Sequence, residues 1–179
     1  MSSEPIRGAL SGQRRALLGL LILVPGCGFR PLHGPRPEGG AAPGLDAVRV
    51  GLIPERNGQL LRRELEARLG SRDGGAARYD LRVGLAYGVE AQGFARDGTP
   101  SRVRITATAN WFLYDLNLPP RLVANGTERA FDAYNIPENQ FFAADTARDA
   151  TERRLVEQLA EDIVRRLAIR LEAAATAAR

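Results

Sequence analysis

The chain has 179 residues, of which 25 are basic and 21 acidic, giving a formal net charge of +4 at pH 7. Every basic residue is arginine, and residues 1–26 account for half of the positive excess, so the rest of the chain is nearly neutral. This balance argues against a nucleic-acid-binding protein, because phosphate backbones are bound by strongly basic surfaces. The single cysteine excludes an intrachain disulfide, so the hydrophobic core alone must stabilise the fold.

Residues 1–26 have the layout of an export signal. Arg14 and Arg15 precede an apolar run at 16–24. A membrane-spanning helix needs about 20 apolar residues, so this run is too short to cross a bilayer. An apolar region of about 7–15 residues after basic residues is typical of a secretory signal peptide. We therefore interpret residues 1–26 as a signal peptide.

Cys27 directly follows this segment, and the residues before it resemble the lipobox of bacterial lipoproteins. Val24 and Gly26 match the aliphatic and small positions, while Pro25 stands where Ala or Ser is more usual. The resemblance implies that Cys27 is acylated and becomes the first mature residue. A diacylglyceryl group plus an N-acyl chain would then hold the protein on a membrane. The alternative is an uncleaved N-terminus in which Cys27 is a free thiol.

The remaining chain is predicted to contain a tether at 27–45 and a single α+β domain at 46–179. The stretch 28–44 is rich in proline and glycine and has no apolar periodicity. Such composition is typical of a linker that is semi-extended where proline dominates. We therefore expect the folded domain to begin near Asp46.

The domain begins with a predicted strand at 48–54 and a helix at 58–69. Leucines recur at four-residue intervals in the helical segment, which indicates one apolar face. We expect Asn57 to cap this helix and Gly70 to end it. The alternating apolar residues of the strand are Val48, Val50 and Leu52.

Two long strands are predicted at 79–90 and 101–116. In each, apolar and polar residues alternate with a period of two, so one face of each strand is apolar. The Asp97-Gly98 pair between them is a strong signal for a hairpin turn. We expect a long antiparallel ribbon with one apolar face.

A fourth strand is predicted at 121–134, followed by a long helix at 144–179. Apolar residues step by four along one side of this helix: Leu155, Leu159, Ile163, Leu167 and Leu171. Such a stripe is typical of a helix packed on a core, and less often of a seam with a partner helix. The order β-α-β-β-β-α predicts an α+β two-layer sandwich, in which two helices cover one face of a four-stranded, mainly antiparallel sheet.

The sequence offers few groups for catalysis. His33, the single histidine, lies in the predicted tether, so a Ser-His-Asp triad or a multi-histidine metal site lacks its parts. No glycine-rich loop has the strand-to-helix spacing of a phosphate-binding motif. We therefore predict no enzymatic activity, no metal and no cofactor.

Arginines near the predicted hairpin turn form a candidate binding site. Arg96 adjoins the turn, and the alternation places Arg102 and Arg104 opposite the apolar face. Together with Arg82 of the neighbouring strand they would form a basic patch able to bind phosphates bidentately. The alternative is a set of solvated arginines that keep the sheet soluble. By the same alternation, Trp111 is predicted to lie in the core.

The stretch CGFRPLHG, from Cys27 to Gly34, closely resembles the mature start of the alphaproteobacterial LPS-assembly lipoprotein family (LptE). The family pattern there runs Cys-Gly-Phe-x-Pro-Leu-Tyr-Gly, and His33 replaces the tyrosine. The segments DGTPSRVR and QLAEDIVRRLAIRL are also similar to this family, so the resemblance extends over most of the mature chain. The family's fold agrees with the two-layer α+β domain predicted above.

This resemblance implies a lipid-anchored protein on the periplasmic face of the outer membrane. Gly28 after the cysteine is similar to lipoproteins that are released to the outer membrane. The family plugs the lumen of a large β-barrel, LptD, assists its assembly and helps insert lipopolysaccharide into the outer leaflet, without covalent catalysis. We expect Arg96, Arg102 and Arg104 to bind lipopolysaccharide through the phosphates of lipid A.

Two other functions stay open from the sequence. One is a stand-alone envelope lipoprotein with a structural or chaperone role and no barrel partner. The other is a periplasmic hydrolase. A barrel plug co-purifies with its barrel, a scaffold does not, and a hydrolase loses its activity when one polar residue is substituted.

Overall fold

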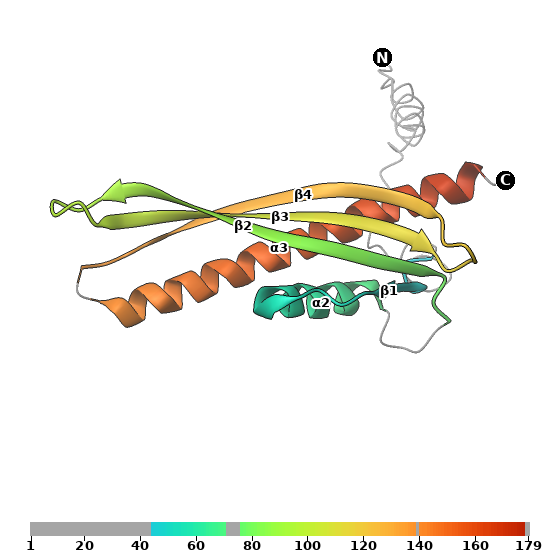
Figure 1. Ribbon diagram of the computed structural model, residues 1–179, viewed down its shortest axis with the longest axis horizontal. Helices are drawn as coiled ribbons and strands as arrows, with labels where there is room; N and C mark the ends of the chain where they lie inside the picture. The colour runs from blue at the N-terminus through green and yellow to red at the C-terminus, as the bar shows by residue number, and fades with distance from the viewer. Residues whose placement is uncertain (1–43, 71–75, 139, 178–179) are drawn as a thin grey trace, which may run out of the picture. The chain divides into compact units, whose positions relative to one another are not determined.

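The structure is a computed structural model that describes residues 44–70, 76–138 and 140–177. The predicted signal peptide, Cys27 and most of the predicted tether lie outside these residues. The described elements are strand β1 (Val48–Val50), helix α2 (Glu55–Leu69), strands β2 (Tyr79–Phe94), β3 (Pro100–Asp115) and β4 (Leu122–Asn135), and helix α3 (Phe141–Ala177) (Figure 1). Their order is the predicted β-α-β-β-β-α.

The four strands form one sheet in the order β1-β2-β3-β4. β1 is parallel to β2, whereas β2, β3 and β4 pair with their neighbours in antiparallel fashion. The sheet is therefore mixed, with one short parallel pair. Both described helices lie on the same face of the sheet (Figure 1). The predicted α+β two-layer sandwich is confirmed.

β1 is shorter than predicted. It ends at Val50, after which the Gly51 N–H donates one more hydrogen bond to the Leu81 carbonyl at 2.8 Å. The chain then leaves the sheet to enter α2, and Ile53 is buried where it packs against Gly58. Leu52, expected on the buried face, is 74% exposed. The alternating pattern did not account for the chain turning away from the sheet.

Asn57 does not cap α2, contrary to the prediction. The helix begins at Glu55 after Pro54, and no side chain caps this end. Asn57 lies in the first helical turn, where its amide nitrogen donates to Oε2 of Glu152 in α3 at 2.8 Å. Proline is also typical of helix starts, and here Pro54 directly precedes the first residue of α2. Gly70 ends the helix as predicted, in the left-handed conformation with φ of 72°.

The hydrophobic core lies between the inner face of the sheet and the helices. The buried residues of β3 are Val103, Ile105, Ala107, Ala109, Trp111 and Leu113. The whole predicted stripe of α3 is buried as well, so this helix packs on the core. Two ion pairs also join α3 to β4, Arg154 with Asp132 at 2.7 Å and Arg166 with Glu128 at 3.2 Å. The predicted position of Trp111 in the core is confirmed.

Trp111 packs across a glycine of the neighbouring strand. It pairs in register with Gly126 of β4. A Cβ atom on Gly126 would lie 2.5 Å from Cζ2 of the indole ring, closer than real Cβ atoms approach other atoms. The missing side chain of Gly126 therefore makes the space that the ring fills.

β2 and β3 form the predicted hairpin. β2 continues to Phe94, beyond the predicted end at residue 90. In the turn, Gly98 has a φ of 82°, which favours glycine, and Oδ1 of Asp97 accepts a hydrogen bond from the Thr99 N–H at 3.0 Å. The chain reverses where the Asp97-Gly98 pair predicted.

Candidate functional site

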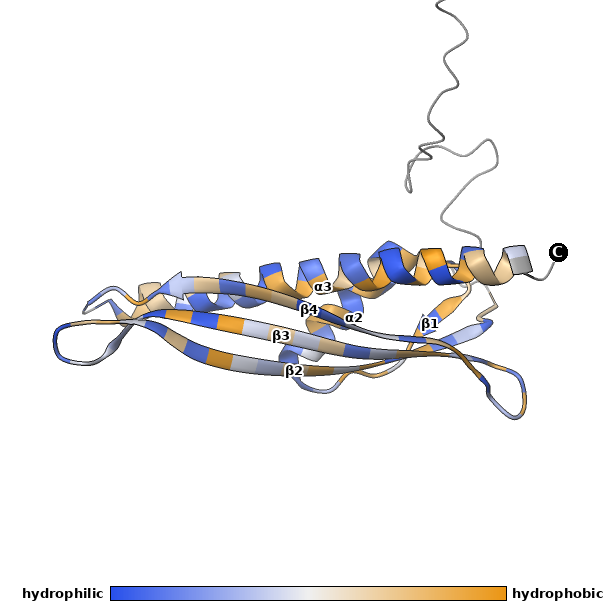
Figure 2. Cartoon of the chain, turned by 90° about the horizontal axis from the view of Figure 1, so that it is seen from above, coloured by the Kyte–Doolittle hydropathy of each residue, from blue (hydrophilic) through white to orange (hydrophobic). Residues whose placement is uncertain are grey.

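The outer face of the sheet, turned away from the helices, carries small and polar side chains. Thr106, Thr108 and Asn110 of β3 alternate with the buried residues of that strand. Opposite them on β2 stand Gly88, Ala86 and Gly84. Figure 2 shows the alternation of hydropathy along the strands. No described helix covers this face, so its hydroxyl and amide groups face outward.

The three predicted site arginines lie at the hairpin end of this sheet. Arg102 and Arg104 alternate with the buried Val103 and Ile105, so both side chains are on the outer face, as predicted. Arg96 lies in the turn and is exposed. We call Arg96, Arg102 and Arg104 the tip arginines.

Two of the tip arginines, Arg102 and Arg104, contact uncharged groups. Nη1 of Arg102 donates to Oδ1 of Asn135 at 3.0 Å. The guanidinium of Arg104 lies over the ring of Phe131, with 5.7 Å between Cζ and the ring centroid. Within the described part of the chain, none of the tip arginines forms an ion pair with a carboxylate. Their positive charge is therefore available to an anionic ligand.

Arg82 is not part of this group, contrary to the prediction. It stands opposite Phe112 in the register, whereas Arg104 stands opposite Glu90. At 3.3 Å per residue, Arg82 is about 26 Å from the level of Arg104 along the ribbon. The predicted face was right, but antiparallel pairing places the beginning of β2 beside the end of β3. The four arginines therefore form two separate groups.

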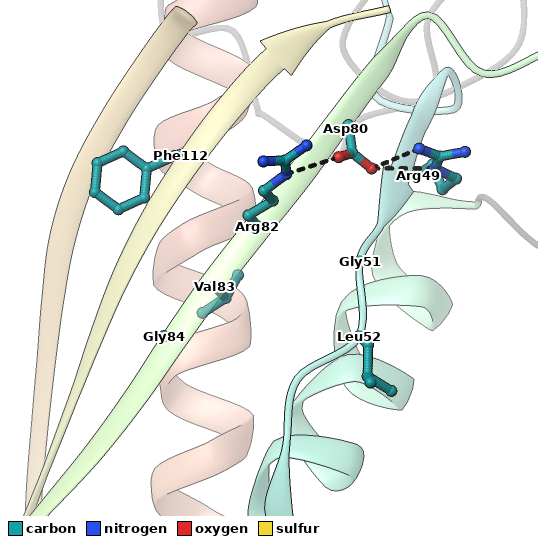
Figure 3. Close-up of a pocket in the computed structure, with 8 residues that line it drawn as sticks. All are labelled: Arg49, Gly51, Leu52, Asp80, Arg82, Val83, Gly84 and Phe112. Atoms are coloured by element: carbon teal, nitrogen blue, oxygen red, sulfur yellow. Dashed lines mark hydrogen bonds and ion pairs between the residues drawn. The ribbon is translucent and has the colours of Figure 1, made fainter.

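Arg82 instead forms a second cluster around Asp80 (Figure 3). Nη2 of Arg49 in β1 donates to Oδ1 of Asp80 at 2.9 Å, and Nε of Arg82 donates to Oδ2 at 3.0 Å. The guanidinium of Arg82 also lies 4.9 Å from the centroid of the Tyr114 ring. We call Arg49, Asp80 and Arg82 the Asp80 cluster.

Asp80 is only 7% exposed, although it lies on the outer face. Burial acts to raise its pKa, but the hydrogen bonds and charges of Arg49 and Arg82 outweigh burial, so the pKa lies below its usual value. Asp80 therefore stays ionised at neutral pH. The sequence alone did not identify this carboxylate as the centre of a cluster, because Arg49 is brought beside it only by the pairing of β1 with β2.

A groove of about 560 Å³ lies beside the Asp80 cluster. Its apolar side chains include Leu52 and the partly exposed Phe112 (Figure 3). Gly51, which directly follows β1, lets this part of the chain lie close to β2, since a Cβ there would lie 3.3 Å from the Leu81 carbonyl oxygen. The full lining is Arg49, Gly51, Leu52, Asp80, Arg82, Val83, Gly84 and Phe112.

Exposed aromatic side chains accompany the tip arginines. Phe94 and Phe131 are both exposed, in the hairpin and in β4. Phe141 and Phe142, which is 91% exposed, begin α3 at the same end of the domain (Figure 1). The sequence patterns did not predict this group. Two adjacent phenylalanines just before the predicted helix, outside its apolar stripe, were the signal that could have found them.

The sequence also bears on three further features: a metal site, a membrane-spanning helix and the lipidation site. Within residues 44–70, 76–138 and 140–177, no three His, Cys, Asp or Glu side chains gather as metal ligands would. In the same ranges, no helix combines the length and apolar character needed to span a bilayer. Cys27 and His33 lie outside the described residues, so the lipidation site stays a prediction.

Comparison with known proteins gives one family. The model of the LptE family, described as lipopolysaccharide-assembly, matches residues 45–167. This match includes all four strands, α2 and most of α3. No curated protein matches the chain.

Several solved structures have a similar fold. A putative lipoprotein from Caulobacter crescentus CB15 is 27% identical, with a TM-score of 0.56 over 70% of this chain and 91% of that chain. A minor lipoprotein from Acinetobacter baumannii is 19% identical, with a TM-score of 0.51 over 68% and 90% of the two chains. The rare lipoprotein B from Shewanella oneidensis is 14% identical, with a TM-score of 0.50 over 68% and 92%. The last two similarities concern the fold alone.

Proposed function

This chain belongs to the LptE family of lipopolysaccharide-assembly proteins, and from this membership we propose that it is an outer-membrane lipoprotein that plugs the LptD β-barrel. In this role it assists assembly of the barrel and binds lipopolysaccharide during transport to the outer leaflet. The family match over 45–167, which includes most of the described domain, carries the proposal. No catalytic step is part of it.

The proposed anchor is an acylated Cys27. Residues 1–26 act as the signal peptide, 27–45 as the tether and 46–179 as the domain that reaches the barrel. The lipobox resemblance at Val24 to Cys27 supports this anchor, and the solved structure from Caulobacter crescentus that is 27% identical is described as a putative lipoprotein. Several acyl chains together give lasting membrane attachment, whereas one chain binds only marginally.

The outer face of the sheet supports the role of a plug. The lumen of a transmembrane β-barrel is polar, so a domain inside it needs an exterior that exchanges hydrogen bonds with that lumen. Thr106, Thr108 and Asn110 present such groups on the central strand, and Thr127 of β4 donates its hydroxyl to Asn110 at 2.7 Å. The residues opposite them on β2 are Gly88, Ala86 and Gly84, which are too small to cover these polar groups.

The tip arginines support binding of lipopolysaccharide. A guanidinium donates two parallel hydrogen bonds to a phosphate, and this geometry suits the phosphates of lipid A. Arg96, Arg102 and Arg104 form no ion pair with a carboxylate of the described chain. The exposed Phe94 and Phe131 beside them offer apolar contact to an amphiphilic ligand.

The plug role is tested by a mild-detergent pull-down of the full-length protein from its native outer membrane, with mass spectrometry of the retained proteins. A stoichiometric large β-barrel is expected. If acylated protein is recovered alone, under conditions that preserve such complexes, the chain is a stand-alone envelope lipoprotein and the plug role is wrong.

The role of the tip arginines is tested by replacing all three with glutamine and measuring binding to purified lipopolysaccharide. Loss of three charge-assisted contacts is expected to weaken binding at least about tenfold. The matched control replaces three exposed helical arginines that form no ion pair in the described chain: Arg63, Arg153 and Arg170. Equal affinity of the two triple variants would contradict the assignment.

The anchor is tested with Cys27→Ala in cells labelled with palmitate. Loss of the label and release of the protein from the membrane fraction are expected, because no acyl chain is then attached. Binding of the purified variant to lipopolysaccharide should stay unchanged, since the tip arginines are untouched. Retained labelling would show that Cys27 is not the acylation site.

A further inference from the structure

β2 has a long edge that the described sheet leaves open. β1 pairs with β2 only from Tyr79 to Leu81. The Gly51 N–H adds one bond to the Leu81 carbonyl at 2.8 Å, and β2 then continues to Phe94. Among the described residues, no further strand pairs with β2 on this side. Open strand edges are places where another polypeptide can pair.

The pattern of hydrogen bonds identifies which backbone groups face this edge. The Tyr79 N–H donates to the Ala47 carbonyl at 3.1 Å, so odd-numbered residues of β2 point away from β3. In a strand, neighbouring residues direct their N–H and C=O groups to opposite sides. The first three outward residues beyond Leu81 are therefore Val83, Leu85 and Tyr87, while the residues between them bond to β3.

The groove beside the Asp80 cluster lies where this edge begins. Val83 and Gly84 of β2 line it on one side, and Gly51 and Leu52 on the other (Figure 3). After Gly51 the chain turns toward α2, so β1 does not continue along β2 beyond this point. An added strand would enter the sheet at this point.

The charges beside the groove indicate which side chain an added strand would carry there. Arg49 and Arg82 share the single carboxylate of Asp80, which leaves one positive charge in excess. Their side chains are 59% and 64% exposed, so unused guanidinium N–H groups face solvent. A second carboxylate could accept hydrogen bonds from these unused N–H groups and balance the excess charge. Leu52 and Phe112 add apolar contact for neighbouring side chains.

We propose that the open edge of β2 is a docking site for an extended polypeptide segment that carries an acidic side chain. The segment pairs with Val83, Leu85 and Tyr87 as an added strand, and its carboxylate binds Arg49 and Arg82. Main-chain hydrogen bonds supply affinity in this mode, and the side-chain contact sets the register. We assign the segment to the barrel protein, and in this respect the inference rests on the proposed function.

Amide hydrogen exchange of the purified complex with the barrel tests this proposal. Exchange is followed at single residues by mass spectrometry, in the free full-length chain and in the complex. The amides of Val83, Leu85 and Tyr87 are expected to slow at least about tenfold in the complex, since each gains a hydrogen bond. The outward amides of the other edge strand, at Thr127 and Arg129 of β4, are the internal control and should change less.

The outcomes separate this inference from the proposed function. If the complex forms and the three β2 amides exchange as fast as in the free chain, the docking site is wrong and the plug role stands. If β4 gains the protection instead of β2, the docking site is also wrong. If no complex with the barrel forms, both proposals are overturned.

A substitution pair tests the backbone bond directly. Leu85→Pro removes an outward N–H that bonds to nothing in the described sheet, and Leu85→Ala removes the same side chain while keeping the N–H. Each variant is expressed with the wild-type chain, and mass spectrometry measures their ratio in the barrel complex. The proline variant should be under-represented about fivefold relative to the alanine variant. Equal representation would overturn the strand pairing.

The acidic contact is tested in the same competition. Arg82→Gln removes one guanidinium of the Asp80 cluster, and Arg63→Gln on α2 is the matched control. We expect about fivefold weaker representation for Arg82→Gln alone. Equal representation of the two variants would overturn the acidic side chain as part of the docked segment.

Discussion

The two faces of β3 serve different purposes within the same 16 residues. On the inner face, apolar residues from Val103 to Leu113 are buried against the helices. On the outer face, side chains from Arg102 to Phe112 point to the uncovered side of the sheet. Burial makes the inner face responsible for stability, whereas the outer face is free to bind. Substitutions on the two faces should therefore have different consequences.

The outer face itself holds two kinds of arginine. Arg49 and Arg82 hold a common carboxylate, which neutralises part of their charge. Arg102 and Arg104 contact an amide and an aromatic ring instead. Position along the ribbon, rather than residue type, thus decides whether an arginine supports the structure or stays available to a ligand.

The largest effect is expected from Trp111→Ala on the inner face. Removing a fully buried indole leaves a cavity, so the free energy of unfolding should fall by about 3–5 kcal/mol. Chemical denaturation of the full-length chain measures this loss. Phe112→Ala, the next residue on the outer face, is the control and should cost less than about 1.5 kcal/mol. Similar losses for the two variants would contradict the division into two faces.

Gly126→Ala should destabilise the protein by a smaller amount. The new Cβ would lie 2.5 Å from the Trp111 ring, so the ring must move, at a cost of about 1–3 kcal/mol. Denaturation of the double variant Gly126→Ala Trp111→Phe should show a cost below the sum of the two single variants, because the smaller ring makes room. Additive losses would show that Gly126 has another role.

Asp80→Asn should have a modest effect that depends on pH. The folded-state pKa of Asp80 lies below its usual value, so its contribution is complete above the ordinary aspartate range and is lost as pH falls through the folded pKa. Near pH 7 we expect a loss of about 1 kcal/mol, because both arginine partners are largely exposed. Denaturation between pH 7 and pH 3 should show a weaker acid dependence in the variant. An unchanged acid dependence would contradict the role of the two arginines.

The smallest effect on stability is expected from the triple replacement of the tip arginines by glutamine. Arg96 and Arg102 are exposed, Arg104 is partly exposed, and none forms an ion pair in the described chain, so the free energy of unfolding should change by no more than about 0.5 kcal/mol. The same variant should bind lipopolysaccharide at least about tenfold more weakly, as proposed above. A large loss of stability would show that these arginines hold the hairpin together, and the binding result would then need another explanation.

Local patterns predicted the parts of the fold that depend on neighbouring residues. The period-two alternation identified the buried residues of β3, including Trp111, and the four-residue steps identified the buried stripe of α3. The Asp97-Gly98 pair located the hairpin turn because only a few residue types adopt its backbone conformation. Asn57 was assigned wrongly, because its amide serves a contact with Glu152 on a distant helix.

The sequence by itself determined the order of elements, the buried face of β3 and of the first part of β2, and the positions of Arg102 and Arg104 on the opposite face. These follow from periodicity, which is a property of adjacent residues. Only the tertiary structure decided that Arg82 joins Asp80 rather than the tip, that Gly126 makes space for Trp111 and that β2 keeps an open edge. Each depends on the register and length of strand pairing, which bring together residues distant in the chain.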